Sequence, residues 1–326
     1  MTADCPACPL CSAQGAEDLV ASSEFVGSAI CCCQSCSLFF LWPVPSEAAL
    51  ERYYRTKGGV RERGLSGPAF RREIVRARSQ ARFLLKRVRP RAGAVVALDV
   101  GPGHGLLMGE LASAGWHISG IDPDADVARA TSQRLGLPVE VGSFPEGLGP
   151  EPEAFDVVIF SHSLEHFRSP IEALTSARRL LAPGGQVYVE LPRASLESVR
   201  STGHFSPHIW HFTPSALRQT LVRAQLHVAE LVGTSPKVKS LRRLLLPLRH
   251  RAAGGQPTPA TGGPPQRTPL LKRILRPCLN VAEALWLYPQ YVYYCGTGSN
   301  PVVIVDDAQD PSVTVLRAIA GKQAQS

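Results

Sequence analysis

The stretch from Val95 to Gly105 reads VVALDVGPGHG and joins an apolar run directly to a glycine-rich loop. The apolar run predicts a short buried strand, and the residues after the loop, 106–114, predict a helix. Glycines at such a junction let the backbone approach a ligand closely, while the start of the helix offers N–H groups to anionic atoms. Asp122 follows Gly101 by 21 residues, at the end of the next expected strand. A carboxylate there can accept hydrogen bonds from both hydroxyls of a ribose, so the pattern indicates a nucleotide-type ligand.

Strands and helices keep alternating after this loop. Further strands are expected at 116–121, 139–141, 155–160, 186–191, 227–232 and 301–305, and helices at 125–135, 170–181 and 214–224. Alternation at this pace is typical of an α/β fold, in which helices cover both faces of a mostly parallel sheet.

The segments on either side of this α/β domain differ from it in composition. We expect a cysteine-rich segment at 1–45, a helical connection at 46–92, the α/β domain at 93–306 with an inserted Leu/Arg-rich and Pro/Gly-rich segment at about 236–295, and a solvated tail at 307–326. The segment 252–269 holds four glycines and five prolines, which predicts a linker or an irregular loop.

Composition narrows the class of protein. The 326 residues are 44% hydrophobic and 19% charged, with a formal net charge of +8. These values suit a chain that buries a core, and the basic balance permits nucleic acid, an anionic membrane or an acidic cofactor as a partner. No run approaches the ~18 apolar residues of a membrane span, and residues 1–10 lack the features of a secretory signal. We therefore expect a cytoplasmic protein without an integral membrane segment.

Seven of the nine cysteines fall within the first 36 residues. Cys8 and Cys11 form one CxxC pair, and Cys33 and Cys36 form a second pair 21 residues later. Each pair can direct two thiolates at one ion, and four such ligands suit tetrahedral Zn²⁺ with no position left for a substrate. We expect a structural zinc ion. Because three more cysteines lie close by, the choice of ligands stays open among a few alternatives: Cys5, Cys31 and Cys32.

Four segments in order resemble the motifs of the class I S-adenosylmethionine-dependent methyltransferases. They read LDVGPGHG at 98–105, GIDPD at 120–124, FDVVIFSHSLEH at 155–166 and RRLLAPGGQVYVELP at 178–192. The resemblance covers about 70–235 and implies a Rossmann-like, seven-stranded sheet with the cofactor above the carboxyl ends of the strands. The cysteine-rich segment resembles the short zinc ribbon that precedes many bacterial members, with serine after each pair where glycine is usual.

The same resemblance assigns roles in cofactor binding. It implies that Gly101, Gly103 and Gly105 cradle the methionine part of S-adenosylmethionine, with Asp99 near its amino group. It further implies that Asp122 binds the ribose and that 142–144 lies beside the adenine. Ser143 stands where the family usually has an acidic residue at the adenine edge.

Histidines gather in two places that are expected to face the acceptor. His162 and His166 follow the strand at 155–160 together with Glu165, and His204, His208 and His211 precede the helix at 214–224. A hydroxyl or amine acceptor needs a base with a pKa near neutrality, which histidine provides. We take His211 and His166 as the candidate catalytic residues. The alternative is that these histidines cap helices and brace loops.

The acceptor is less determined by the sequence. We expect methyl transfer to a small-molecule or a glycan- or lipid-linked acceptor, with peripheral membrane contact through the Leu/Arg-rich segments at 237–251 and 270–276. One alternative is an rRNA methyltransferase whose zinc finger grips RNA. Another is a cofactor-binding adaptor without catalysis. The Asn-Pro-Pro-Tyr-type motif that stacks a flipped base is missing after the strand at 155–160, which argues against DNA. The methylated atom, O, N or C, stays open.

Overall fold

The computed structural model describes residues 6–22, 25–57, 67–91, 93–148, 153–202, 208–236, 302–305 and 314–322. The chain divides into two compact units: 1–63 with 80–235 and 304–326, and 64–79 with 236–303. The first unit carries every site discussed below. The Leu/Arg-rich and Pro/Gly-rich segments at 237–276 and His204 lie outside the described residues, so the predictions made for them stay predictions.

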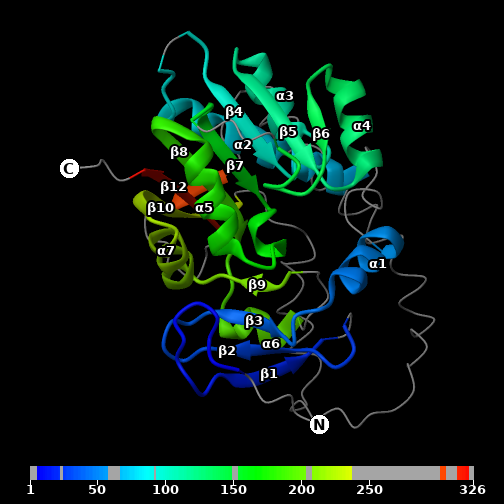
Figure 1. Cartoon of the computed structure of the whole chain (residues 1–326), viewed down its shortest axis with the longest axis vertical. Coiled ribbons are helices and arrows are strands. Elements are labelled where there is room, and N and C mark those ends of the chain that lie inside the picture. The colour runs from blue at the N-terminus through cyan, green and yellow to red at the C-terminus, as the bar shows by residue number, and fades with distance from the viewer. Residues whose placement is uncertain are drawn as a thin grey trace. The chain divides into compact units, whose positions relative to one another are not determined.

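A large sheet forms the centre of the first unit. Its strands are β4 (Val96–Val100), β5 (His117–Asp122), β6 (Val139–Val141), β7 (Phe155–Ser161), β8 (Leu181–Pro192), β10 (Leu226–Pro236), β11 (Val302–Val305) and β12 (Val315–Lys322). The strand order is β11-β10-β12-β8-β7-β4-β5-β6 (Figure 1). Strands β6, β5, β4, β7 and β8 pair in parallel, whereas β12 is antiparallel to both β8 and β10. The seven strands from β10 to β6 confirm the predicted mostly parallel sheet, and β11 adds a short eighth strand at one edge.

The helices are α1 (Glu47–Lys57), α2 (Gly67–Arg87), α3 (Leu106–Ser113), α4 (Ala125–Leu135), α5 (Pro170–Leu180), α6 (Leu196–Thr202) and α7 (Pro214–Arg223), with a 3-10 turn at Leu164–His166. Four of the helices, α3, α4, α5 and α7, begin and end close to where the sequence predicts them, whereas α6 was not predicted. Side chains of Asp124, Ser169 and Thr213 cap α4, α5 and α7 by accepting N–H bonds from the first turn. These caps satisfy donors that the helix itself cannot, which fixes where each helix starts. Among the described residues, no helix is long and apolar enough to cross a membrane.

A second, smaller sheet joins the cysteine-rich segment to the α/β domain. Strands β1 (Glu17–Ala21), β2 (Ala29–Cys32) and β3 (Phe39–Trp42) are antiparallel, and β9 (Trp210–His211) completes the sheet beside β3. Phe39 pairs with His211, and Phe40 pairs with Trp210. The boundary expected at residue 45 is therefore crossed by a continuous hydrogen-bonded sheet.

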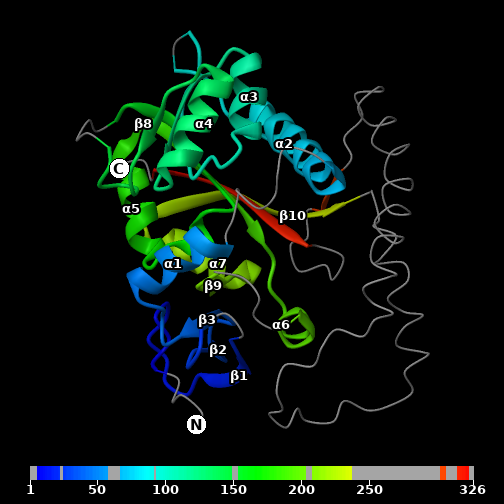
Figure 2. The same cartoon turned by 90° about the vertical axis from the view of Figure 1, so that its right-hand side faces the viewer.

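The expectation of a solvated tail at 307–326 is wrong for the part that the structure describes. Strand β12, the red strand in Figure 2, lies between β8 and β10 in the sheet. Its residues Leu316, Ala318 and Ile319 are almost fully buried. The sequence VLRAIAGK misleads because Arg317 interrupts an otherwise apolar run. Its charge is accommodated because the residue opposite it on β8 is Glu190.

Arg317 and Glu190 form a fully buried ion pair. Both side chains are 1% exposed, and the guanidinium Nε donates to Glu190 Oε2. The Tyr188 hydroxyl donates to the same oxygen at 2.9 Å. Burial of either charge alone would cost several kcal/mol, so each side chain is tolerated in the sheet only because the other is present.

Replacing Arg317 by methionine should therefore destabilise the fold by about 3–5 kcal/mol, because it leaves the Glu190 carboxylate buried without its cation. Urea unfolding followed by circular dichroism measures this change. The control is Arg87→Met. Arg87 pairs with Glu230, and both side chains of that pair are roughly one-third exposed, so the loss should be at most about 1 kcal/mol. Equal, small losses in both variants would contradict the assigned role of the Arg317 pair.

Candidate functional site

The glycine loop forms a tight turn between β4 and α3. Gly101, Gly103 and Gly105 all have positive φ, at 75°, 55° and 60°. This is the left-handed region, which other residues rarely adopt. A side chain on Gly105 would come within 2.7 Å of Thr131 and Leu135 on α4, so close helix packing as well as conformation requires a glycine there. The loop thus exposes backbone, with few side chains, at the carboxyl end of β4.

Two carboxylates lie beside this loop at the ends of adjacent parallel strands. Asp99 on β4 is 1% exposed and Asp122 on β5 is 7% exposed. Burial raises the pKa of Asp99 to about 7, and the negative charge of Asp122 adds to the shift. Burial also raises the pKa of Asp122 to about 6, although N–H groups of Asp124 and Gly103 stabilise its charge. The pair is therefore a site that favours a bound cation.

Two buried polar atoms next to the loop have no hydrogen-bond partner among the described residues. They are Asp99 Oδ1 and Ser163 Oγ. Ser163 follows β7, and its Cβ would lie 3.1 Å from a Cβ built on Gly101, so the carboxyl ends of β4 and β7 meet at this point. Buried polar groups are normally satisfied, so this arrangement fits a polar ligand held between the two strands.

The loop after β6 lies at the same edge of the sheet. The Gly142 N–H donates to the Asp122 carbonyl at 3.0 Å, which ties this loop to the end of β5. Ser143 is exposed, whereas the Phe144 ring is buried and packs edge-on against Phe160 and Phe167. Of the two side chains predicted beside an adenine, only that of Ser143 is open to a ligand. Its role there stays a prediction.

The histidines form one cluster around Glu165, which is 1% exposed. His162 Nδ1 lies 3.7 Å and His208 Nε2 lies 3.8 Å from Glu165 Oε1. The His166 and His208 rings have centroids 4.7 Å apart, and those of His208 and His211 are 5.9 Å apart. The structure therefore places His166 and His211, the two candidate bases, each beside the His208 ring.

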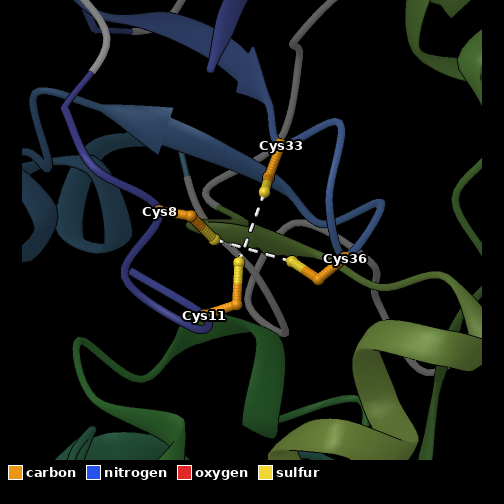
Figure 3. Close-up of side chains that lie close together, drawn as sticks. All are labelled: Cys8, Cys11, Cys33 and Cys36. Atoms are coloured by element: carbon orange, nitrogen blue, oxygen red, sulfur yellow. Dashed lines mark hydrogen bonds between the residues drawn. The ribbon is translucent and has the colours of Figure 1, made fainter. Parts of the chain in front are cut away.

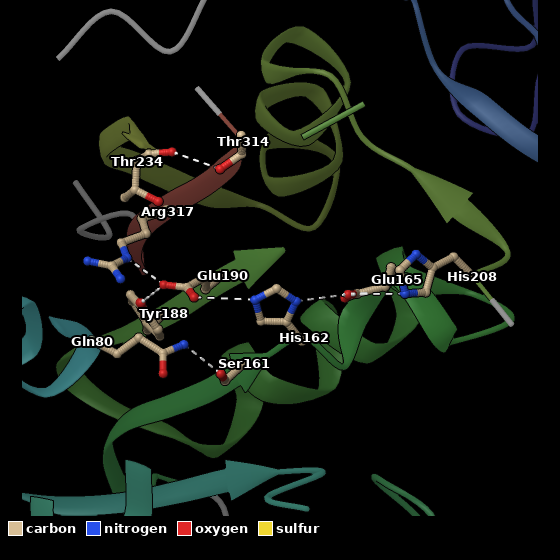
Figure 4. A network of polar contacts seen from close by, with 10 residues as sticks. All are labelled: Gln80, Ser161, His162, Glu165, Tyr188, Glu190, His208, Thr234, Thr314 and Arg317. Carbon is tan, nitrogen blue, oxygen red and sulfur yellow. Dashed lines mark hydrogen bonds and ion pairs between the residues drawn. The ribbon is translucent and has the colours of Figure 1, made fainter. Parts of the chain in front are cut away.

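A chain of polar contacts links this cluster to the buried ion pair of the sheet (Figure 4). His162 Nε2 lies 3.3 Å from Glu190 Oε1, and Glu190 in turn is held by Arg317 and Tyr188. The backbone of His162 has a positive φ of 55°, and its N–H donates to the Glu190 carbonyl at 2.8 Å. The ring of His162 is thus placed between two carboxylates, Glu165 and Glu190.

The four thiols of Cys8, Cys11, Cys33 and Cys36 converge in the N-terminal sheet (Figure 3). All four sulfur atoms lie within 4.8 Å of one another, and the Cys8–Cys36 and Cys11–Cys33 pairs are each 3.5 Å apart. Zn–S bonds of about 2.3 Å in a tetrahedron separate the sulfurs by about 3.8 Å, so the four positions fit zinc. The Cys36 thiol, by hydrogen bonding, holds the pKa of Cys8 below its ordinary value.

Each CxxC pair sits in a tight turn of the same kind. The Ser12 N–H donates to the Cys8 carbonyl at 2.8 Å, and the Ser37 N–H donates to the Cys33 carbonyl at 2.9 Å. Both serines have a positive φ, 63° and 60°, at positions where glycine would be easier. Among the alternative ligands, Cys31 is disulfide-bonded and Cys32 lies outside the four-thiol cluster, while Cys5 is not among the described residues.

Sequence reasoning missed Glu190 and Arg317 and gave Glu165 no role. One signal was present: Glu190 is a lone charge in the apolar strand QVYVEL, which predicts a buried partner. The partner lies 127 residues away in a segment expected to be solvated, so the pairing was not visible from sequence spacing.

Comparison with known proteins agrees with these motifs. A family model described as a methyltransferase domain matches residues 70–231. Ubiquinone biosynthesis O-methyltransferase of Roseobacter denitrificans is 39% identical over 92 residues, which cover 27% of this chain and 37% of that protein. The enzyme of the same name from Marinobacter nauticus is 31% identical over 156 residues, 42% of this chain and 66% of that protein.

These relatives match over part of their length only; the alignment spans less than half of the Roseobacter protein. Among solved structures, a SAM-dependent methyltransferase from Archaeoglobus fulgidus is similar at 12% identity and a TM-score of 0.45, over 83% of this chain and 98% of that one. The family model covers strands β4 to β8, the glycine loop and the buried carboxylates described above. Residues 70–231 therefore form a class I S-adenosylmethionine-dependent methyltransferase domain.

Proposed function

We propose that the protein transfers a methyl group from S-adenosylmethionine to a hydroxyl group of a small-molecule acceptor, including one linked to a glycan or a lipid. One observation carries the proposal. The glycine loop, on the cofactor side, and the segment with Glu165 and His166, on the acceptor side, lie at the same edge of the sheet. Ser163, whose Cβ lies 3.1 Å from the position that a Cβ on Gly101 would take, is followed within three residues by Glu165 and His166. The names of the curated relatives, O-methyltransferases, favour oxygen as the methylated atom.

The cofactor side rests on charge and on backbone access. S-Adenosylmethionine carries an ammonium group and supplies a methyl group activated by its sulfonium. We assign the ammonium to Asp99, whose Oδ1 has no hydrogen-bond partner among the described residues. Asp122, at the end of β5, is assigned to the ribose hydroxyls, and Ser143 to the adenine side. Gly101 and Gly103 leave the space in which the methionine part lies against the backbone, while Gly105 sets the turn into α3.

On the acceptor side, the chain's own residues have to position a hydroxyl in line with the methyl group and accept its proton. His211 is the first candidate base: its side chain is half-buried, and its neighbours in sequence, Trp210 and Phe212, are buried, which limits access of water to this segment. His166 is the second candidate, on the 3-10 turn that follows β7. Positioning itself supplies much of the rate in such transfers, and a base adds the proton acceptance.

We also propose that one structural Zn²⁺ is held by Cys8, Cys11, Cys33 and Cys36. All four positions of a tetrahedral ion would then be taken by the protein, so this ion has no place in the chemistry. Its effect on the acceptor side is mechanical. Strand β3, which follows the second CxxC pair, hydrogen-bonds to β9 and so to the segment that carries His211.

Cofactor affinity should fall as pH is lowered. Below a pKa of about 7 the free Asp99 carboxyl is protonated, and an ammonium group can pair with it only after the proton is released. Calorimetry with S-adenosylhomocysteine, which keeps the ammonium group, should show about tenfold weaker binding at about pH 6 than at about pH 8.

Asp99→Asn should bind more weakly at about pH 8 and lose most of this pH dependence, whereas the exposed control Asp18→Asn should behave as wild type. The folded-state pKa of Asp99 is raised, so its contribution to stability is present at low pH and is lost as pH rises through about 7. The free Asp99→Asn protein should therefore be more stable than wild type at about pH 8. A wild-type affinity independent of pH would refute the ammonium assignment.

Cys33→Ser should abolish zinc binding, since structural zinc sites in small finger peptides are worth about 10–16 kcal/mol apparent at neutral pH. Elemental analysis measures the metal, and amide hydrogen exchange should show faster exchange in β1 to β3 and at 209–211, with β4 to β8 unchanged. Cys32→Ala, at the neighbouring cysteine outside the cluster, should keep the zinc. A purified wild-type protein without zinc would disprove the site.

His211→Ala should lower methyl transfer by about a hundred- to ten-thousandfold while changing S-adenosylhomocysteine affinity by no more than about twofold. The assay follows label from methyl-labelled S-adenosylmethionine into the small-molecule and lipid-extractable fractions of a bacterial extract. His227→Ala, at an exposed position on β10, is the control. Unchanged transfer in both His211→Ala and His166→Ala would remove both bases from the mechanism, and label recovered in RNA instead would contradict the acceptor class.

A further inference from the structure

Glu165, His166 and His208 bring one carboxylate and two imidazoles to one point beside the glycine loop. One ligand atom from each lies within 4.8 Å of the other two. Glu165 is buried, and both histidines are half-buried. This cluster is separate from the four thiols of the N-terminal sheet and contains none of the side chains assigned to the cofactor.

The separations are close to those of a metal site. Bonds of about 2.1 Å from a tetrahedral Zn²⁺ to nitrogen and oxygen place the donor atoms about 3.4 Å apart. His208 Nε2 and Glu165 Oε1 are 3.8 Å apart, so an ion would draw them together by only a few tenths of an ångström. In Figure 4 the His208 ring and the Glu165 carboxylate face one another.

The backbone holds the two contributing segments together. The Ile209 N–H donates to the Glu165 carbonyl at 3.0 Å, and the Trp210 indole N–H donates to the Phe167 carbonyl at 2.7 Å. The residue next to each of these anchors, His208 before Ile209 and His166 before Phe167, is a candidate ligand. The three ligands are thus preorganised, although they come from segments about 40 residues apart in sequence.

An outer layer of contacts orients the carboxylate. His162 Nδ1 lies 3.7 Å from Glu165 Oε1, and the other ring nitrogen of His162 lies 3.3 Å from Glu190. Residues behind the ligands of a metal site commonly fix ligand orientation in this way. A buried carboxylate also needs positive charge nearby, and a divalent ion supplies more of it than two half-buried imidazoles do.

We propose that Glu165, His166 and His208 bind a divalent transition-metal ion of the zinc class and leave at least one coordination position open. Two imidazoles and one carboxylate with an open position are the ligand set of catalytic zinc and of related transition-metal sites, in contrast to the closed thiolate set of the ribbon. The open position takes an oxygen of the acceptor, a hydroxyl or a deprotonated hydroxyl. Metal binding stands independently, whereas this role for the ion rests on the proposed function. With His166 bound to the ion, His211 is the base.

The test is a titration with Co²⁺ of the full-length protein carrying one equivalent of zinc, held by the four cysteines, followed by calorimetry and visible absorption. One equivalent should bind with the weak absorption of nitrogen and oxygen ligands. The intense thiolate band that marks cobalt in the four-cysteine site should not appear. His208→Ala and Glu165→Gln should each weaken this binding by at least about tenfold, and His117→Ala, at an exposed position on β5, should leave it unchanged.

Thermal unfolding checks that each variant is folded, and His208→Ala serves where the change at the buried Glu165 harms the fold. The site would be overturned if the wild type bound no cobalt through nitrogen and oxygen ligands. It would also be overturned if neither variant weakened the binding of that cobalt ion. Failure of S-adenosylhomocysteine to bind, with cobalt binding intact, would count against the proposed function and leave the metal site standing.

Discussion

Burial of negative charge at the carboxyl edge of the sheet is the constraint on which the rest of the site depends. Asp99, Asp122, Glu165 and Glu190 are each at most 7% exposed. A carboxylate removed from water costs several kcal/mol unless hydrogen bonds or a positive charge compensate it. The compensation differs from one carboxylate to the next, and this difference separates the parts of the site that hold the fold from the parts that are ready for a ligand.

The negative charge of Glu190 is compensated by a cation that belongs to the fold itself. Arg317 comes from β12, and the antiparallel register of β12 on β8 places it directly opposite Glu190. The inserted last strand is therefore part of the site, because it supplies the charge that holds Glu190 against His162. Asp99 has no such partner among the described residues, and the charge of Asp122 makes its ionisation harder. The negative charges of Asp99 and Asp122 repel one another, and a cationic ligand bound beside them would compensate this repulsion.

Most of the sheet and the cysteine cluster could be predicted from sequence because both depend on local patterns. Apolar runs of five or six residues, capping residues such as Thr213 and the CxxC spacing act over short distances. Strand β12 could not be predicted, since Arg317 makes the segment look solvated until its partner on β8 is known. The same limit applies to the histidine cluster. Each histidine was visible, but only the fold brings His208 to Glu165, 43 residues away.

The pairing of β3 with β9 gives the N-terminal sheet a physical connection to the acceptor side. Strand β9 is only two residues long, and a pair of that length has little stability of its own in water. It is held because Phe39 and Phe40 lie opposite it in a sheet whose turns are closed by the four thiols. The segment 208–212, which carries His208 and His211, is therefore ordered from two sides, by the ribbon sheet and by the hydrogen bond from Ile209 to Glu165. The sheet that carries the four thiols can in this way determine the geometry of a site to which it contributes no reacting group.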